Sequence, residues 1–107
     1  MQPVFTIYPG IPSRTVNISL TQDGFVIDHS GITRVKLYVG STLFDSQAQP
    51  TLFDLTKTDK IIAKLANASP ALAPGTYTCL LVIYDGGNYS GGYPWDQDFL
   101  LHVNAVP

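Results

Sequence analysis

Residues 72–84 are the strongest indication of the fold class: they read Leu72-Ala73-Pro74-Gly75-Thr76-Tyr77-Thr78-Cys79 and continue without a break into Leu80-Leu81-Val82-Ile83-Tyr84. A Pro-Gly turn leads into a long apolar strand, and a tyrosine stands two residues before a cysteine on that strand. In one common type of β-sandwich, a tyrosine at this spacing bonds back to the corner that the chain has just left. We therefore predict a structural corner made by Pro74, Gly75 and Tyr77.

The rest of the chain is divided into short segments in which apolar and polar residues alternate, as they do in half-buried strands. Turn residues such as Asp23-Gly24 and Gly40-Ser41 separate the segments. Residues 58–66 also fit a short helix with Thr58 as its cap, so strand and helix both stay open there. The predicted strands are Val4–Tyr8, Arg14–Leu20, Thr33–Val39, Thr42–Asp45, Ile61–Leu65, Thr76–Tyr84 and Asp98–Val103.

A tyrosine corner and about seven strands are typical of an immunoglobulin-like sandwich. We predict an all-β fold, namely a single immunoglobulin-like antiparallel β-sandwich that spans residues 1–107 as one domain. A chain of 107 residues is long enough for one hydrophobic core. Cys79 is the only cysteine, so the sandwich is expected to have no disulfide.

The composition argues against several classes of partner. Only 13% of the residues are charged, against roughly 25% in an average soluble domain, so we expect other protein to cover part of the surface. The six basic residues are scattered and make no footprint for nucleic acid. No apolar run approaches the roughly 18 residues of a membrane span, so membrane insertion is not expected. The first residues carry neither positive charge nor a long apolar run, so no secretion signal is expected.

The candidate catalytic side chains form no recognisable motif. His29 and His102 are the only histidines, and neither stands in a local pattern that supplies a nucleophile and an orienting acid. Cys79 lies on an apolar strand and is expected to be a packed structural thiol. We therefore predict no enzymatic activity and no catalytic residues.

Three aspartates near one loop form the only candidate metal cluster. Asp85, Asp96 and Asp98 flank the loop, but their spacing matches no calcium-binding pattern. Aspartates at turns and strand ends commonly bond to nearby backbone amides instead. We predict no metal and no cofactor.

Two surfaces are candidates for binding a partner. The glycine-rich loop 85–97 carries Tyr89, Tyr93 and Trp95, and its Tyr/Ser/Gly/Asn chemistry resembles that of antibody paratopes. Trp95 is expected to fold back over the edge of the core. The second surface is the outer face of the strand 76–84, which shows apolar residues where a solvated sheet shows polar ones. The residues predicted for this face are Tyr38, Leu80, Val82, Tyr84 and Leu100.

The segment from Ile32 to Val103 resembles a group of short phage and prophage structural proteins with an immunoglobulin-like (fibronectin-like) fold. The blocks that carry the likeness are Ile32-Thr33-Arg34-Val35-Lys36-Leu37, Phe53-Asp54-Leu55, Lys60-Ile61-Ile62, Leu72-Ala73-Pro74-Gly75-Thr76-Tyr77, Leu81-Val82-Ile83-Tyr84-Asp85 and Pro94-Trp95. The resemblance implies a virion component of the capsid, neck or tail, located in the virion or the host cytoplasm.

The expected function is that of a non-enzymatic structural or accessory virion protein. It would act through protein–protein contacts with virion neighbours or with copies of itself in a homo-oligomer. The alternative is a carbohydrate-binding or adhesion module whose aromatic loop 85–97 contacts a surface glycan.

Overall fold

The computed structural model describes residues 4–11, 15–68, 71–86, 89–95 and 98–104. These residues form strands and two short 3-10 helices, η1 (Pro50–Leu52) and η2 (Leu65–Asn67), and no α-helix lies among them. None of their helical segments is long and apolar enough to cross a membrane. The strands are β1 (Val4–Ile7), β2 (Val16–Ile18), β3 (Thr21–Gln22), β4 (Phe25–Val26), β5 (Ile32–Val39), β6 (Thr42–Asp45), β7 (Phe53–Asp54), β8 (Ile61–Ala63), β9 (Gly75–Asp85), β10 (Tyr89–Pro94) and β11 (Phe99–Val103).

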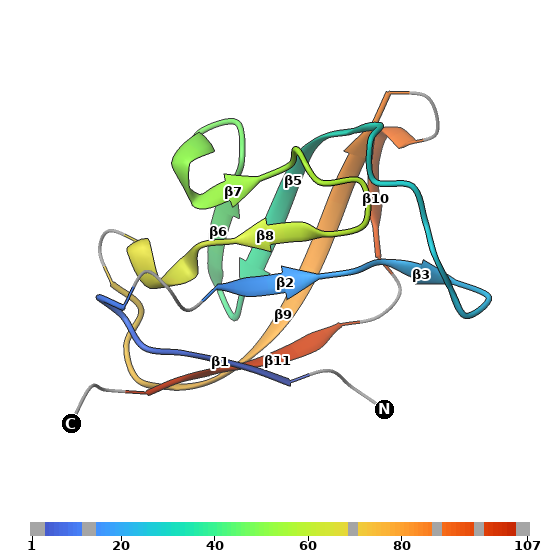
Figure 1. Ribbon diagram of the computed structural model, residues 1–107. Helices are drawn as coiled ribbons and strands as arrows, with labels where there is room; N and C mark the ends of the chain where they lie inside the picture. The colour runs from blue at the N-terminus through green and yellow to red at the C-terminus, as the bar shows by residue number, and fades with distance from the viewer. Residues whose placement is uncertain (1–3, 12–14, 69–70, 87–88, 96–97, 105–107) are drawn as a thin grey trace.

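The strands form two larger sheets and one small ribbon. The larger sheet has the order β1-β11-β9-β5-β6, and β10 pairs with β9 as its sixth strand. The second sheet has the order β2-β8-β7, and β3 pairs only with β4. Figure 1 shows the three-stranded sheet in front of β5 and β9, with its strands running across theirs.

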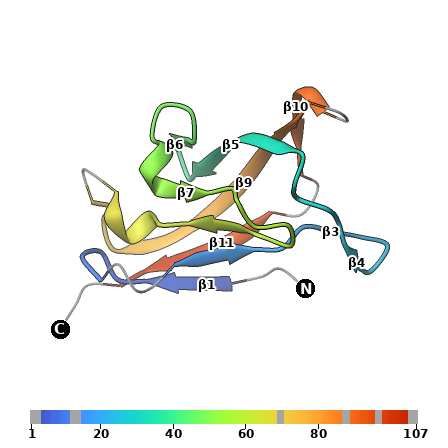
Figure 2. The ribbon, with the colours of Figure 1, turned by 45° about the horizontal axis from the view of Figure 1, so that its top comes forward.

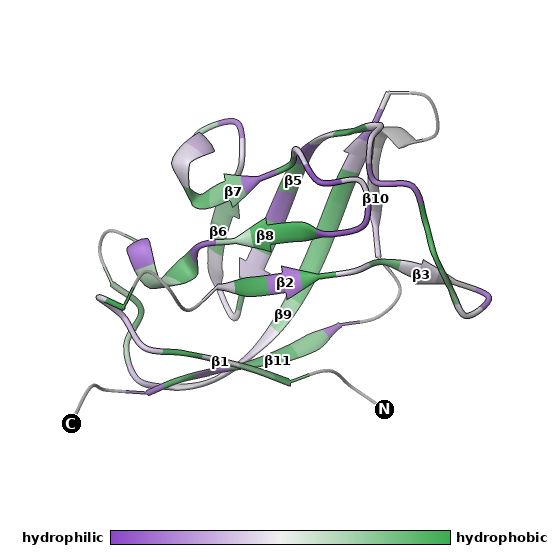
Figure 3. Ribbon diagram, viewed as in Figure 1, coloured by the Kyte–Doolittle hydropathy of each residue, from purple (hydrophilic) through white to green (hydrophobic). Residues whose placement is uncertain are grey.

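A single hydrophobic core joins the two larger sheets. Alternate residues of each strand point into it, as the period of two requires, and Figure 3 shows hydrophobic stretches on β2, β8 and β9. On β9 these are Cys79, Leu81 and Ile83, which are almost completely buried, while their neighbours face outward. The corresponding inward residues of the other central strands are Val35, Leu37 and Val39 on β5, Val16 and Ile18 on β2, and Ile61 and Ala63 on β8.

The strand predictions are confirmed at seven places, and the all-β class holds. β6 has the predicted bounds Thr42–Asp45, and the long strand extends to Gly75–Asp85. In the ambiguous segment, β8 ends at Ala63 and η2 begins at Leu65, so strand and helix each account for part of it. Four strands were not predicted, namely β3, β4, β7 and β10.

Two predictions are corrected. The segment 85–97 is not simply a loop, because Tyr89–Pro94 forms β10 and pairs antiparallel with β9. The free edge of β9 offers backbone hydrogen bonds there, and these outweigh the low strand propensity of glycine. The sheet is also not wholly antiparallel, since β1 runs parallel to β11 from the pair Val4/Leu100 to the pair Ile7/Val103.

The predicted tyrosine corner is confirmed. The Tyr77 hydroxyl donates a hydrogen bond to the carbonyl oxygen of Ala73 over 2.6 Å, just upstream of the Pro74-Gly75 turn. This bond joins the start of β9 to the segment that enters it. The corner therefore sets the direction in which β9 leaves the turn.

Replacing Tyr77 with phenylalanine should lower the free energy of unfolding by about 1 kcal/mol, the usual net contribution of one such hydrogen bond. Urea denaturation measures the change. Tyr38→Phe is the matched control, because Tyr38 is 36% exposed on the outer side of the same sheet. Equal losses in the two variants would contradict a specific role for the corner.

Candidate functional site

The outer face of the six-stranded sheet gathers apolar side chains from five of its strands, β1, β5, β6, β9 and β11. Tyr38 of β5 stands between Leu80 of β9 and Leu43 of β6 in register. Leu100 of β11 is flanked by Val4 of β1. Four of these side chains are open to solvent, with exposed fractions of 53% for Val4, 43% for Leu43, 39% for Leu80 and 36% for Tyr38. We call this surface, made by Val4, Tyr38, Leu43, Leu80, Val82 and Leu100, the outer sheet face.

The structure places the predicted patch residues on this face in two different states. Tyr38 and Leu80 are exposed, whereas Val82 and Leu100 are half-buried. Val82 is opposite Lys36 of β5 and Pro94 of β10, so its neighbours include both a charged and an apolar side chain. The apolar surface is therefore centred on Tyr38, Leu80 and Leu43.

Tyr84 belongs to a polar cluster at the other end of the same face. Its ring centroid lies 5.1 Å from the guanidinium carbon of Arg34 and 5.7 Å from Nζ of Lys36. Such distances are typical of cation–π contacts. Gly92 of β10 approaches the ring so closely that a Cβ atom there would lie 2.8 Å from Cε2 of Tyr84. The Tyr84 ring is thus engaged within the chain.

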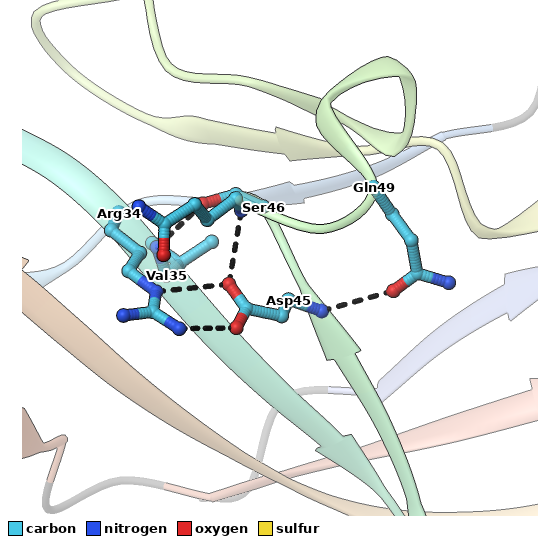
Figure 4. A network of polar contacts seen from close by, with 6 residues as sticks. Arg34, Val35, Asp45, Ser46 and Gln49 are labelled. Atoms are coloured by element: carbon cyan, nitrogen blue, oxygen red, sulfur yellow. Dashed lines mark hydrogen bonds and ion pairs between the residues drawn. The ribbon is translucent and has the colours of Figure 1, made fainter.

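Arg34 is held by an acidic partner, Asp45, which is itself held by the turn that follows β6 (Figure 4). Its Nε donates to Oδ1 of Asp45 over 3.0 Å, and its Nη2 donates to Oδ2. The backbone N–H of Gln47 donates to Oδ1 of Asp45 over 2.9 Å, and Oε1 of Gln49 accepts from the Asp45 N–H over 3.1 Å. A shallow groove of about 590 Å³ lies beside this cluster and is lined in part by Phe53 and Leu55.

These contacts lower the pKa of Asp45 from 3.8 to about 2. The hydrogen bonds from Arg34 are the main cause, and the Gln47 backbone N–H acts in the same direction. The carboxylate therefore stays charged in the folded protein at pH values where the unfolded chain already takes up a proton.

The stabilisation by this carboxylate should be complete above about pH 4 and should fade as the pH falls towards 2, because the pKa is lowered on folding. Asp45→Asn should therefore be less stable than the parent at pH 7, and the difference should shrink as the pH falls through about 2. Urea denaturation at a series of pH values measures this. Asp59→Asn, a change at an exposed aspartate, is the control and should show no such convergence.

The rings of both histidines meet neighbouring groups of the same chain. His29 is 1% exposed, and both ring nitrogens meet backbone groups, Nδ1 at 2.8 Å from the Ile27 oxygen and Nε2 at 3.1 Å from the Leu20 nitrogen. His102 Nδ1 lies 2.9 Å from Oγ1 of Thr76. Among the described residues, no three His, Cys, Asp or Glu side chains form a group that would hold a metal ion. Of the three candidate aspartates, Asp85 is buried, Asp98 is exposed, and Asp96 lies outside the described residues.

The predicted burial of Cys79 is confirmed, since the residue has no exposed surface. Burial raises the pKa of its thiol to about 12. The thiolate is the reactive form, so the group is inert at neutral pH.

Cys79 in the native protein should react with a bulky aromatic disulfide reagent more than about ten-fold more slowly than in the unfolded chain, because reaction requires opening of the core. The absorbance of the released thiolate follows the reaction with and without denaturant. Labelling of the native protein at the rate of a free thiol would contradict the burial.

The aromatic segment 85–97 is resolved into parts with different environments. Trp95 is 7% exposed, as predicted, and its backbone N–H donates to the Leu81 oxygen over 2.8 Å. Tyr89 and Tyr93 lie on β10, but their side chains fall outside the described residues. The described part of this segment therefore presents no open aromatic ring.

Four exposed apolar residues on strands were not predicted from the sequence. Leu43 and Val4 extend the outer sheet face, while Phe25 and Val26 lie on the ribbon β3–β4. Leu43 and Phe44 are adjacent on a strand, so one of the two had to face outward. For Phe25 the signal was the Asp23-Gly24 pair, which is typical of a two-residue hairpin turn.

Comparison of the chain with protein-family models gives no match, and comparisons with curated proteins and with solved structures give none either. The function is therefore inferred from the surfaces just described.

Proposed function

We propose that this chain is a non-enzymatic, immunoglobulin-like structural module that binds a protein neighbour through the outer sheet face. Because residues 32–103 resemble short phage proteins, the proposed setting of the module is an accessory position in a phage particle. The neighbour is another particle protein or a second copy of the chain.

The strand order supports the immunoglobulin-like part of the proposal. Immunoglobulin sandwiches place their second, fifth and fourth strands in one sheet and the third, sixth and seventh in the other. With β2 as the second strand, the order β2-β8-β7 and the order β5-β9-β11 follow that arrangement. The Tyr77 corner and the position of Cys79 two residues later agree with it.

The observation that carries the proposed function is the exposure of Tyr38, Leu43 and Leu80 side by side on three adjacent strands. Single exposed apolar residues are ordinary on protein surfaces, but contiguous groups mark interaction sites. The cationic Lys36 and Arg34 lie on the same face, beyond this group along β5. An apolar centre with a charged border is the usual composition of a protein–protein interface.

The glycan-binding alternative has less support. Sugar rings stack on aromatic faces that are open to solvent, and Trp95 is buried. Tyr38 is exposed, but its neighbours Leu43 and Leu80 offer no hydrogen-bonding groups in their side chains. No described residue of the 85–97 segment favours that function.

Leu80→Lys should weaken association while leaving the protein folded, because the side chain is exposed on the outer side of β9. Burial of one leucine gains about 1.5–3 kcal/mol, so its loss should weaken binding about ten- to a hundred-fold. The measurements are particle mass by sedimentation over a range of concentrations, and incorporation of the variant into purified particles. Thermal unfolding checks the fold.

The matched control is Asn17→Lys, which adds the same charge at an exposed position on the other sheet. It should behave as the parent protein in both measurements. The proposal is contradicted when the Leu80→Lys protein is folded and still associates and incorporates as fully as the parent.

A further inference from the structure

The ribbon β3–β4 carries an apolar side chain away from the body of the molecule. Figure 2 shows the ribbon at one end of the structure, clear of the two larger sheets. Phe25 is 77% exposed, more than any other large hydrophobic residue in the described part of the chain, and the adjacent Val26 is 52% exposed. No function discussed above uses either residue.

The ribbon is held in one conformation by its turn and its base. Asp23 and Gly24 both have positive φ, 54° and 83°, which is the geometry of a type I′ turn and suits the twist of a two-residue hairpin. At the base, the Ile27 N–H donates to the Leu20 oxygen over 3.0 Å. Phe25 is therefore presented on a short, ordered arm.

His29 fastens the base to the core from the side. Its Nε2 accepts the Leu20 N–H, and its Nδ1 lies within bonding distance of the Ile27 oxygen, so one ring bridges both arms of the ribbon. The backbone N–H of His29 in turn donates to the Thr58 oxygen over 2.9 Å. An arm fixed in this way loses little conformational entropy when its tip is bound.

A pocket that suits an aromatic ring lies at the end of the molecule opposite the ribbon β3–β4. It has a volume of about 290 Å³ and is lined mainly by Leu43, Phe44, Ala71, Leu72 and Tyr77, and none of the described residues of its wall carries a charge. A dry cavity of about 150 Å³ holds a benzene ring, so this pocket is large enough for the side chain of a phenylalanine. Figures 1 and 2 place the segment before β9 and the ribbon β3–β4 at opposite ends of the structure.

We propose that Phe25 of one copy of this chain inserts into this pocket of a second copy, head to tail. The ribbon cannot reach the pocket of its own chain, since the two lie at opposite ends, so the contact joins different molecules. A contact of this kind uses two different patches and leaves one of each free, so it continues into a ring or a filament. The contact is small, so it is weak between free molecules and becomes effective where copies are held close together.

All proteins in the test carry Leu80→Lys, which weakens the contact proposed for the outer sheet face, and Leu43, which belongs to both surfaces, is left unchanged. One variant adds Phe25→Ser and loses the inserting ring; another adds Ala71→Glu and places a carboxylate at the pocket. The parent in this test is the protein that carries Leu80→Lys alone, and its sedimentation at high concentration should show assemblies larger than a dimer. The association constant of each further variant should be lower by about ten-fold or more. An equal mixture of the two variants should form a 1:1 dimer and nothing larger, because each supplies the part that the other lacks.

Ile11→Ser is the matched control, since Ile11 is an exposed apolar residue that lies outside the ribbon, the pocket lining and the outer sheet face. It should assemble as the parent does. Thermal unfolding monitors the fold, and Thr42→Glu, at another exposed position of the pocket wall, replaces Ala71→Glu if that variant does not fold. A parent that stays monomeric at the highest concentration, a Phe25→Ser variant that assembles fully, or a mixture that forms no dimer would each overturn the proposal.

Discussion

Strand β9 is hydrogen-bonded along both of its edges, and this pairing sets the positions of three other strands of the larger sheet. One edge pairs with β5 from Cys79 to Asp85. The other edge is shared, with β11 along Gly75–Cys79 and β10 along Val82–Asp85. A one-residue slip of β9 would turn its buried row outward and break the register with all three partners together. The inward row of Cys79, Leu81 and Ile83 therefore fixes which residues of the neighbouring strands face the core and which form the outer sheet face.

Sequence alone predicted the parts of the fold that local pattern controls. Alternation identified β5 and β11, and the Leu-x-Pro-Gly-x-Tyr stretch identified both the start of β9 and the corner that Tyr77 makes. Alternation also predicted that Leu80 and Val82 face away from Cys79 and Leu81, and their relative exposure agrees. These features depend on residues close together in the chain.

The missed features depend on contacts between distant residues. β10 has the glycine-rich composition of a loop and becomes a strand because the edge of β9 beside it is free to pair. Tyr84 was assigned to an apolar patch, but the cations beside its ring come from β5, about fifty residues earlier in the chain. The exposure of Phe25 depends on the ribbon β3–β4 standing clear of the sheets, and no periodicity in the sequence shows where a hairpin will stand.

Polar side chains inside this protein complete the backbone hydrogen bonding. His29 serves the ribbon, and Oγ of Ser46 accepts the Val35 N–H over 2.9 Å at the turn after β6. Every buried side-chain nitrogen and oxygen in the described residues has a partner. A buried histidine whose two nitrogens are both occupied has no free site for a substrate proton, so this histidine is explained by architecture. The contacts proposed for this chain therefore use its open apolar surfaces.

The parallel pairing of β1 with β11 affects how the sheet resists tension. When two parallel strands are pulled by their opposite ends, they slide along each other, and the hydrogen bonds between them are strained together. In an antiparallel hairpin pulled at its open end, the bonds break one after another. The four register pairs from Val4/Leu100 to Ile7/Val103 thus share any tension applied between the beginning of β1 and the end of β11. Phe5 packs edge-on against Phe99 across the same pair of strands, with ring centroids 5.3 Å apart, and adds resistance to that sliding. A module tethered through these two strands would bear tension along the direction in which its hydrogen bonds are hardest to break.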